Sequence, residues 1–185
     1  MEFTPRILKA INFAARIHHR MTRKGKKDIE YITHPLGVAV ILAGIDCHEE
    51  IVIAGILHDT VEESDGGLSL SDLAQEFGFQ VAKMVEDVTE KDKSLPWDER
   101  KRLALEHIKR MEKDSMLVKS ADLLYNMTDL ALDLETEGDK VYDKFNAPKE
   151  KQLARFKSVI KALTDAWPDN PLLPKLREAL KRITG

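Results

Sequence analysis

Residues 49–63 contain an unbroken apolar run that is followed directly by His58 and Asp59. The seven residues 51–57 are Ile, Val, Ile, Ala, Gly, Ile and Leu, so a helix across this segment is apolar on most of its sides. A helix of that kind must be covered by neighbours on most faces, which predicts a central position in the core. His58 shares a helical face with Gly55, so we expect its ring to lie on the buried side.

Helix-start and helix-stop signals recur along the rest of the chain. Thr4 followed by Pro5 is typical of a helix start, and Ser69 to Asp72 resembles a capping box that opens a helix ending at Gly78. No stretch shows period-two alternation bounded by hairpin turns. The expected helices start at Pro5 and span 33–45, 49–63, 69–77, 79–88, 98–113, 115–132, 148–166 and 172–183, with loops at 22–30 and 91–96 and a mobile loop at 135–145.

These elements predict an all-α protein. The 185 residues suffice for one domain with a substantial core. With no repeat, low-complexity tract or long linker, we expect a single domain over residues 1–185, with C-terminal helices across 148–183 packing on the rest.

Charge and cysteine content narrow the partners and the compartment. The net charge of −3 argues against wholesale binding to nucleic acid or to an anionic membrane. The lone Cys47 permits no internal disulfide. Without an apolar leader or a membrane-length apolar run, we expect a cytoplasmic protein. The sequence leaves open whether the chain forms a homo-oligomer.

Four residues could share a metal ion, namely His34, His58, Asp59 and Asp122. Imidazole nitrogens together with carboxylates suit Mn, Fe, Zn and related divalent ions. Asp122 lies on the apolar side of its helix, as His58 does, and a buried polar group without a partner costs about 1–3 kcal/mol. A shared ion would satisfy both. The alternative also stands, because a His-Asp pair is common by chance and a buried His often simply bonds a backbone carbonyl.

Two acidic residues follow the His-Asp pair. Glu62 lies four residues after His58, on the same helical face, and Glu63 comes next. A bound metal lowers the pKa of its water, and a carboxylate one turn from the ligand is well placed to orient or deprotonate that water. The alternative is a solvated helix end, although anions are unfavourable beside the negative end of the helix dipole.

A basic cluster precedes His34 in an otherwise acidic chain. Arginine forks and lysine point charges both suit phosphate, although such a run is often only a solvated loop. The cluster comprises Arg16, Arg20, Arg23, Lys24, Lys26 and Lys27.

Several sequence blocks resemble the hydrolase domain of the RelA/SpoT family, especially its stand-alone small alarmone hydrolases. They occur in the family's order between residues 10 and 130. The most specific are Tyr-Ile-Thr-His-Pro at 31–35, Leu-His-Asp-Thr-Val-Glu at 57–62, and Lys-x-Ala-Asp-x-x-x-Asn at 119–126. Shorter matches are Phe-Ala-Ala at 13–15, Arg-Lys at 23–24, Phe-Gly at 77–78 and Val-Thr at 88–89.

The resemblance implies an all-helical HD-domain fold with one divalent ion, typically manganese. It implies removal of the 3′-pyrophosphate from ppGpp or pppGpp, a reaction of the stringent response. It assigns the metal to His34, His58, Asp59 and Asp122, and water activation to Glu62 and Glu63. It assigns nucleotide binding to Arg23, Lys24, Lys119 and Asn126.

The chain departs from the family pattern at two positions. Glu63 stands where the family usually has Asp, and Leu123 where it usually has Arg or Lys. A misplacement of about 1 Å can cost two orders of magnitude in rate. Three alternatives therefore remain: an HD phosphohydrolase acting on another nucleotide such as NADPH or a nucleoside phosphate, a catalytically weak alarmone-binding module, and a helical bundle without metal.

Overall fold

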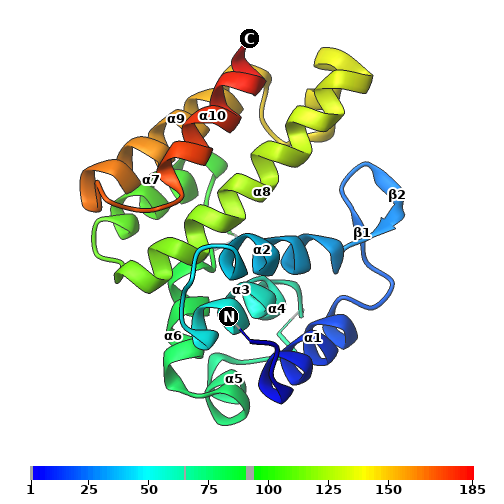
Figure 1. Ribbon diagram of the computed structural model, residues 1–185. Helices are drawn as coiled ribbons and strands as arrows, with labels where there is room; N and C mark the ends of the chain where they lie inside the picture. The colour runs from blue at the N-terminus through cyan, green and yellow to red at the C-terminus, as the bar shows by residue number, and fades with distance from the viewer. Residues whose placement is uncertain (1, 65, 91–93) are drawn as a thin grey trace. The chain divides into compact units, whose positions relative to one another are not determined.

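The computed structural model describes residues 2–64, 66–90 and 94–185 and divides the chain into two compact units. The first unit comprises Met1–Lys91 and Glu112–Asp122, and the second comprises Asp92–Met111 and Leu123–Gly185. Apart from one small hairpin, the regular elements of the described residues are helices (Figure 1), so the all-α prediction is confirmed. The expectation of a single domain stays a prediction.

The first unit is built around α3 (Glu49–Leu57), in which every residue from Ile51 to Leu57 is buried. This helix contacts α1, α2 and α6 (Figure 1), which confirms the central position expected from its apolar run. The unit contains α1 (Pro5–Ile17), β1 (Thr22–Arg23), β2 (Lys26–Glu30), α2 (Thr33–Ala43), α3, α4 (Thr60–Glu63), α5 (Leu70–Phe77), α6 (Phe79–Val88) and the start of α8 (Lys113–Glu137).

Local capping chemistry fixes several helix starts. The Thr4 hydroxyl accepts a hydrogen bond from the Ile7 N–H at 3.3 Å, with Pro5 at the first helical position of α1. Ser69 and Asp72 form the predicted capping box at the start of α5. Both starts were expected from the sequence and are confirmed.

Gly55 lets α2 and α3 pack closely. A Cβ atom at this position would lie only 2.5 Å from Cδ1 of the buried Leu42 on α2. A larger residue would push the two helices apart, because a packed interior has no spare volume there. The glycine therefore helps to hold α2 and α3 close together.

The segment expected as a loop over 22–30 instead contains an antiparallel hairpin of β1 and β2. Gly25, at φ 78°, allows the tight turn between the strands. The strands are short and mostly exposed, so they lack the apolar alternation that identifies a half-buried strand. That lack explains why the sequence pattern missed them.

The second unit contains α7 (Trp97–Ile108), the rest of α8, the 3₁₀ helix η1 (Gly138–Lys144), α9 (Lys149–Ala166) and α10 (Leu173–Thr184). Helix α9 contacts both α7 and α10. The expectation of a mobile loop over 135–145 is wrong, because α8 continues to Glu137 and η1 follows it. Burial of Val141 and Tyr142 holds η1 in place, and Lys144 pairs with Glu137 at 2.7 Å.

Other expected boundaries shift without changing the fold. The helix expected over 98–113 ends at Ile108, and α8 begins at Lys113. The loop expected over 91–96 is described only for residues 94–96, since 91–93 lie outside the described residues.

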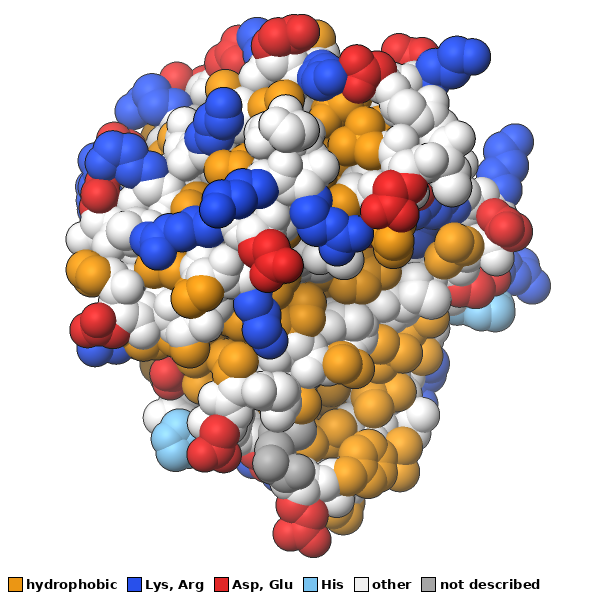
Figure 2. Space-filling view, turned by 45° about the horizontal axis from the view of Figure 1, so that its top comes forward, with side chains coloured by type: hydrophobic (Ala, Val, Ile, Leu, Met, Phe, Trp, Pro, Cys, Tyr) orange, Lys and Arg blue, Asp and Glu red, His pale blue; other side chains and the backbone are white. Residues whose placement is uncertain are grey.

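The described surface mixes charges and some apolar groups. On the face drawn in Figure 2, lysine and arginine side chains are interspersed with aspartate and glutamate, and hydrophobic side chains also gather there. The most exposed large apolar side chains include Val40 at 72% and Phe79 at 76%. Among the described residues, no helix is long and apolar enough to cross a membrane.

Candidate metal centre

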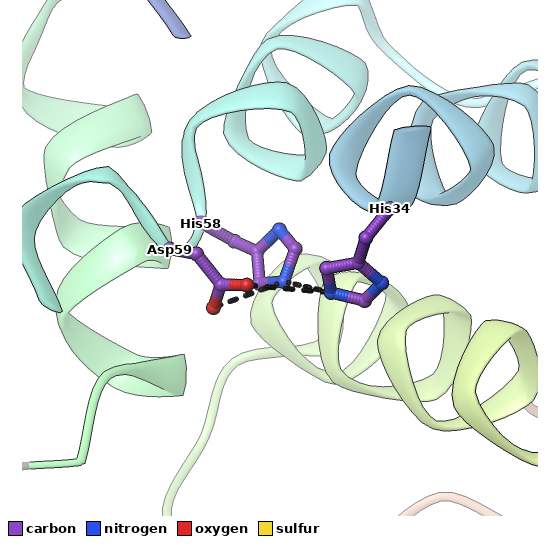
Figure 3. Close-up of side chains that lie close together, drawn as sticks. All are labelled: His34, His58 and Asp59. Carbon is purple, nitrogen blue, oxygen red and sulfur yellow. Dashed lines mark hydrogen bonds and ion pairs between the residues drawn. The ribbon is translucent and has the colours of Figure 1, made fainter. Parts of the chain in front are cut away.

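Three side chains from the first unit converge at one buried point (Figure 3). His34 is the second residue of α2, and His58 and Asp59 lie between α3 and α4. The two rings are 2% and 3% exposed, and their Nε2 atoms lie 3.0 Å apart. Asp59 Oδ1 lies 3.2 Å from His58 Nε2, and Oδ2 lies 3.3 Å from His34 Nε2.

Asp122, on the part of α8 that belongs to the first unit, approaches the same point. Its Oδ1 lies 3.6 Å from His34 Nε2 and 3.9 Å from His58 Nε2. Its Oδ2 accepts a hydrogen bond from the Lys119 ammonium at 3.0 Å. The structure thus brings together all four residues that the sequence nominated as metal ligands.

The helix expected over 49–63 is interrupted at this site. Asp59 has φ −98° and ψ −5°, in the sparsely populated bridge region where many active-site residues lie. The His58 Nδ1–H donates to the Gly55 carbonyl at 2.8 Å, and the Thr60 hydroxyl donates to the Leu57 carbonyl at 2.7 Å. These side-chain donors occupy carbonyls at the end of α3 and accompany the break between α3 and α4.

The ring orientations fit a metal ion. With Nδ1–H bonded to a backbone carbonyl, the neutral ring of His58 would present the lone pair of Nε2 to an ion in the cluster, as metal-binding histidines usually do. Two nitrogens bound to one ion at right angles lie about 3 Å apart when each metal–nitrogen bond is about 2.1 Å long. The observed separation of 3.0 Å between the Nε2 atoms is compatible with that arrangement. Two imidazoles with carboxylates form a donor set that suits divalent transition metals.

The charges of the cluster are strongly coupled. Burial opposes protonation of His58, but the carboxylates of Asp59 and Asp122 outweigh it and raise the pKa of His58 to about 9. Burial would raise the pKa of Asp59, but the neighbouring His58 and His34 hold it well below its usual range. Likewise the ammonium of Lys119 and the two histidines offset burial and lower the pKa of Asp122 to about 2. The site therefore keeps its carboxylates ionised and ready for a cation.

The acidic residues nominated for water activation lie on α4. The half-buried Glu62 accepts a hydrogen bond from the Glu90 N–H at 3.4 Å through Oε2, which ties its side chain to the segment after α6. The sequence argument gave Glu62 the same helical face as His58, and the break between α3 and α4 removes that reason. Glu63 acts electrostatically on Tyr31, whose hydroxyl contacts Asp59.

The nominated nucleotide-binding residues lie in different elements of the chain. Arg23 lies in β1 with its guanidinium 5.7 Å from the centroid of the Tyr31 ring, whereas Lys24 is exposed in the hairpin turn. Lys119 is paired with Asp122. Asn126 belongs to the second unit.

Sequence reasoning missed Tyr31, which links several of these groups. Its hydroxyl donates to Asp59 Oδ2 at 2.7 Å. The only available signal was its place three residues before His34 in the Tyr-Ile-Thr-His-Pro block.

Comparisons with known proteins agree with this geometry. The model of the HD domain family matches residues 10–151. The human guanosine-3′,5′-bis(diphosphate) 3′-pyrophosphohydrolase MESH1 is 45% identical over 126 residues, covering 67% of this chain and 69% of the human protein. The Drosophila melanogaster MESH1 protein is 35% identical over 133 residues, covering 71% and 73% of the two chains.

A solved structure extends the likeness to nearly the whole chain. It is described as "A metazoan ortholog of SpoT hydrolyzes ppGpp and plays a role in starvation responses" and has a TM-score of 0.80. It is 28% identical to this chain and covers 98% of this chain and 97% of that one. The chain therefore belongs to the HD domain family, and it is an enzyme of the metal-dependent phosphohydrolase type.

Proposed function

We propose that this protein is a guanosine-3′,5′-bis(diphosphate) 3′-pyrophosphohydrolase. It would hydrolyse ppGpp to GDP and pyrophosphate, and pppGpp to GTP and pyrophosphate. The observation that carries the proposal is the cluster of His34, His58, Asp59 and Asp122, in a chain that is 45% identical to human MESH1 over 126 residues. We further propose a cytoplasmic enzyme of the stringent response.

The four residues of the cluster would hold one divalent ion, for which we propose manganese. Such an ion, when bound, lowers the pKa of a water molecule and polarises a phosphoryl oxygen. The chain orients the metal ligands. The His58 Nδ1–H bond to the Gly55 carbonyl fixes the ring, and the ionised Asp59 and Asp122 supply negative charge to a site that excludes most solvent.

Glu62 would take the proton from the attacking water. Its hydrogen bond from the Glu90 N–H restrains the carboxylate, and a positioned carboxylate base contributes about 10²–10⁴-fold to rate. Glu63 would help to orient the same water. Both assignments rest on the family resemblance and on the place of the two residues in α4, which begins directly after Asp59.

Arg23, Lys24, Lys119 and Asn126 would bind the nucleotide. Arg23 is best supported, because its guanidinium lies over the ring of Tyr31, which bonds Asp59. Lys119 has three N–H donors, so its bond to Asp122 leaves donors for a phosphate oxygen. The contributions of Lys24 and Asn126 rest on the family resemblance alone.

The proposal is tested with metal-free protein to which manganese is added before ppGpp. We expect one bound ion per chain. We also expect release of GDP and pyrophosphate, which is measured by anion-exchange chromatography. Asp122→Ala should lose both the ion and the activity. Stoichiometric manganese in that variant would exclude Asp122 as a ligand.

The substrate is tested on the same preparation. If the protein turns over NADPH or a nucleoside phosphate in preference to ppGpp, then an alarmone is not its substrate. Tight ppGpp binding without product would indicate a binding module, an outcome that the longer carboxylate of Glu63 makes worth testing.

A further inference from the structure

Tyr31 lies at a junction between the candidate metal centre and the β1–β2 hairpin. It follows β2 directly, and its hydroxyl donates to Asp59 Oδ2 at 2.7 Å. Its ring meets the His34 ring edge-on, with centroids 5.9 Å apart. The guanidinium of Arg23 lies 5.7 Å from the centroid of the same ring. One side chain thus contacts two metal-ligand candidates and one phosphate-binding candidate.

The Tyr31 hydroxyl is the donor in this contact. The phenol carries a single O–H proton, and its oxygen lies 2.7 Å from Asp59 Oδ2. An ionised carboxylate is acceptor-only, so the hydrogen bond has a single direction. The bond therefore restricts rotation of the Asp59 carboxylate and holds Oδ2 on the Tyr31 side.

A buried histidine supports the ring of Tyr31 from another direction. His18, at the end of α1, is 2% exposed, and its ring centroid lies 4.9 Å from that of Tyr31 at an interplanar angle of 40°. Among the residues that the structure describes, neither nitrogen of His18 has a hydrogen-bond partner. Burial lowers the pKa of His18, so a neutral ring packs against the phenol.

We propose that Tyr31 is a positioning residue that holds the Asp59 carboxylate in place for the metal ion and connects it to Arg23. The inference rests on the proposed function, because it assumes that Asp59 binds the catalytic ion. Hydrogen-bond partners of metal ligands orient those ligands, and losing one typically costs 10–100-fold in metal affinity or activity. The hydroxyl should thus set metal affinity, and the ring should set the position of Arg23.

The two roles separate experimentally. Tyr31→Phe removes the hydroxyl but keeps the ring beside Arg23 and His18, whereas Tyr31→Leu removes both. Tyr142→Phe is a matched control, because Tyr142 is also buried, at 6% exposed, and its hydroxyl has no hydrogen-bond partner among the described residues. Tyr142 also belongs to the second unit.

Manganese affinity of the metal-free proteins is measured by calorimetry and by competition with a chelator. We expect Tyr31→Phe to weaken manganese binding by about 10–100-fold and Tyr142→Phe to leave it within about twofold of the wild type. At saturating manganese, the KM for ppGpp should hold in Tyr31→Phe and rise in Tyr31→Leu. Melting temperatures of the metal-free variants check that each protein is folded.

The outcomes distinguish this inference from the proposed function. Wild-type manganese affinity in a folded Tyr31→Phe variant would overturn the positioning role while leaving the hydrolase intact. If the wild-type protein does not hydrolyse ppGpp but Tyr31→Phe still weakens manganese binding, the proposed substrate is overturned and the positioning role of Tyr31 stands. A wild-type protein that binds no manganese would overturn both.

Discussion

Raising the pH should destabilise the metal-free protein and strengthen its metal binding, and both effects should come from His58. The carboxylates of Asp59 and Asp122 raise the pKa of His58 from 6.5 to about 9 in the folded protein. A raised folded-state pKa contributes stability that is fully present below the unfolded value and is lost as pH rises through the folded value. The window for this loss is therefore pH 6.5 to about 9.

The magnitude follows from the size of the shift. A difference of about 2.5 units at about 1.4 kcal/mol per unit corresponds to roughly 3 kcal/mol of unfolding free energy. Little solvent screens this group, because His58 is only 3% exposed. For a chain of this length, the loss lowers the melting temperature by about 6–12 °C. Metal binding requires neutral imidazole, so each pH unit below about 9 weakens it about tenfold.

The assay compares metal-free and manganese-loaded protein between pH 6.5 and 9. Differential scanning calorimetry reports the melting temperatures, and titration calorimetry in buffers of different ionisation enthalpy counts the protons released on binding. We expect about one proton released near pH 7.5. A manganese affinity that stays constant from pH 7 to 8.5, together with a constant melting temperature of the metal-free protein, would refute the charge coupling assigned to His58.

Four substitutions test further residue assignments. Glu62→Gln keeps the size of the side chain but cannot take a proton, so kcat should fall by about 10²–10⁴ while manganese content holds; an unchanged kcat would remove Glu62 from the mechanism. Arg23→Ala and Lys24→Ala should each raise the KM for ppGpp more than they lower kcat. Added salt should lower the activity, because it screens exposed charge contacts. Unaltered KM values would show that these two residues do not bind the nucleotide. Glu63→Asp shortens the carboxylate to the family's length and should increase ppGpp turnover if Glu63 misaligns the water; equal turnover on every substrate would mean that its carboxylate does not reach the water.

The sequence predicted the features that depend on residues close together in the chain. The apolar run 51–57 predicted a central helix because a surface helix has a polar face and this run has none. The structure buries α3 over that run. Capping at Thr4 and Ser69 depends on side chains that bond their own neighbours, so both helix starts were predictable. The family resemblance is likewise confirmed by the HD domain match over residues 10–151 together with the likeness to the MESH1 proteins.

Features that depend on distant partners were not predictable in this way. Tyr31 acquires its role only because folding brings Asp59, 28 residues later, within hydrogen-bond distance. Glu62 is restrained by the backbone of Glu90, also 28 residues away. The segment expected to be a mobile loop forms η1, in which Val141 and Tyr142 are buried. None of these partners leaves a periodic signal in the local sequence.

The break between α3 and α4 explains how two adjacent residues can serve one ion. Successive side chains in a regular α-helix project about 100° apart, so His58 and Asp59 on a continuous helix would point in different directions. With Asp59 in the bridge region, both side chains instead reach Nε2 of His34, at 3.0 Å from His58 and 3.3 Å from Asp59. The uninterrupted helix expected from the sequence is thus broken at the two residues that contribute to the cluster. Sequence periodicity could not predict this local conformation, because it depends on side-chain donors that occupy the carbonyls at the end of α3.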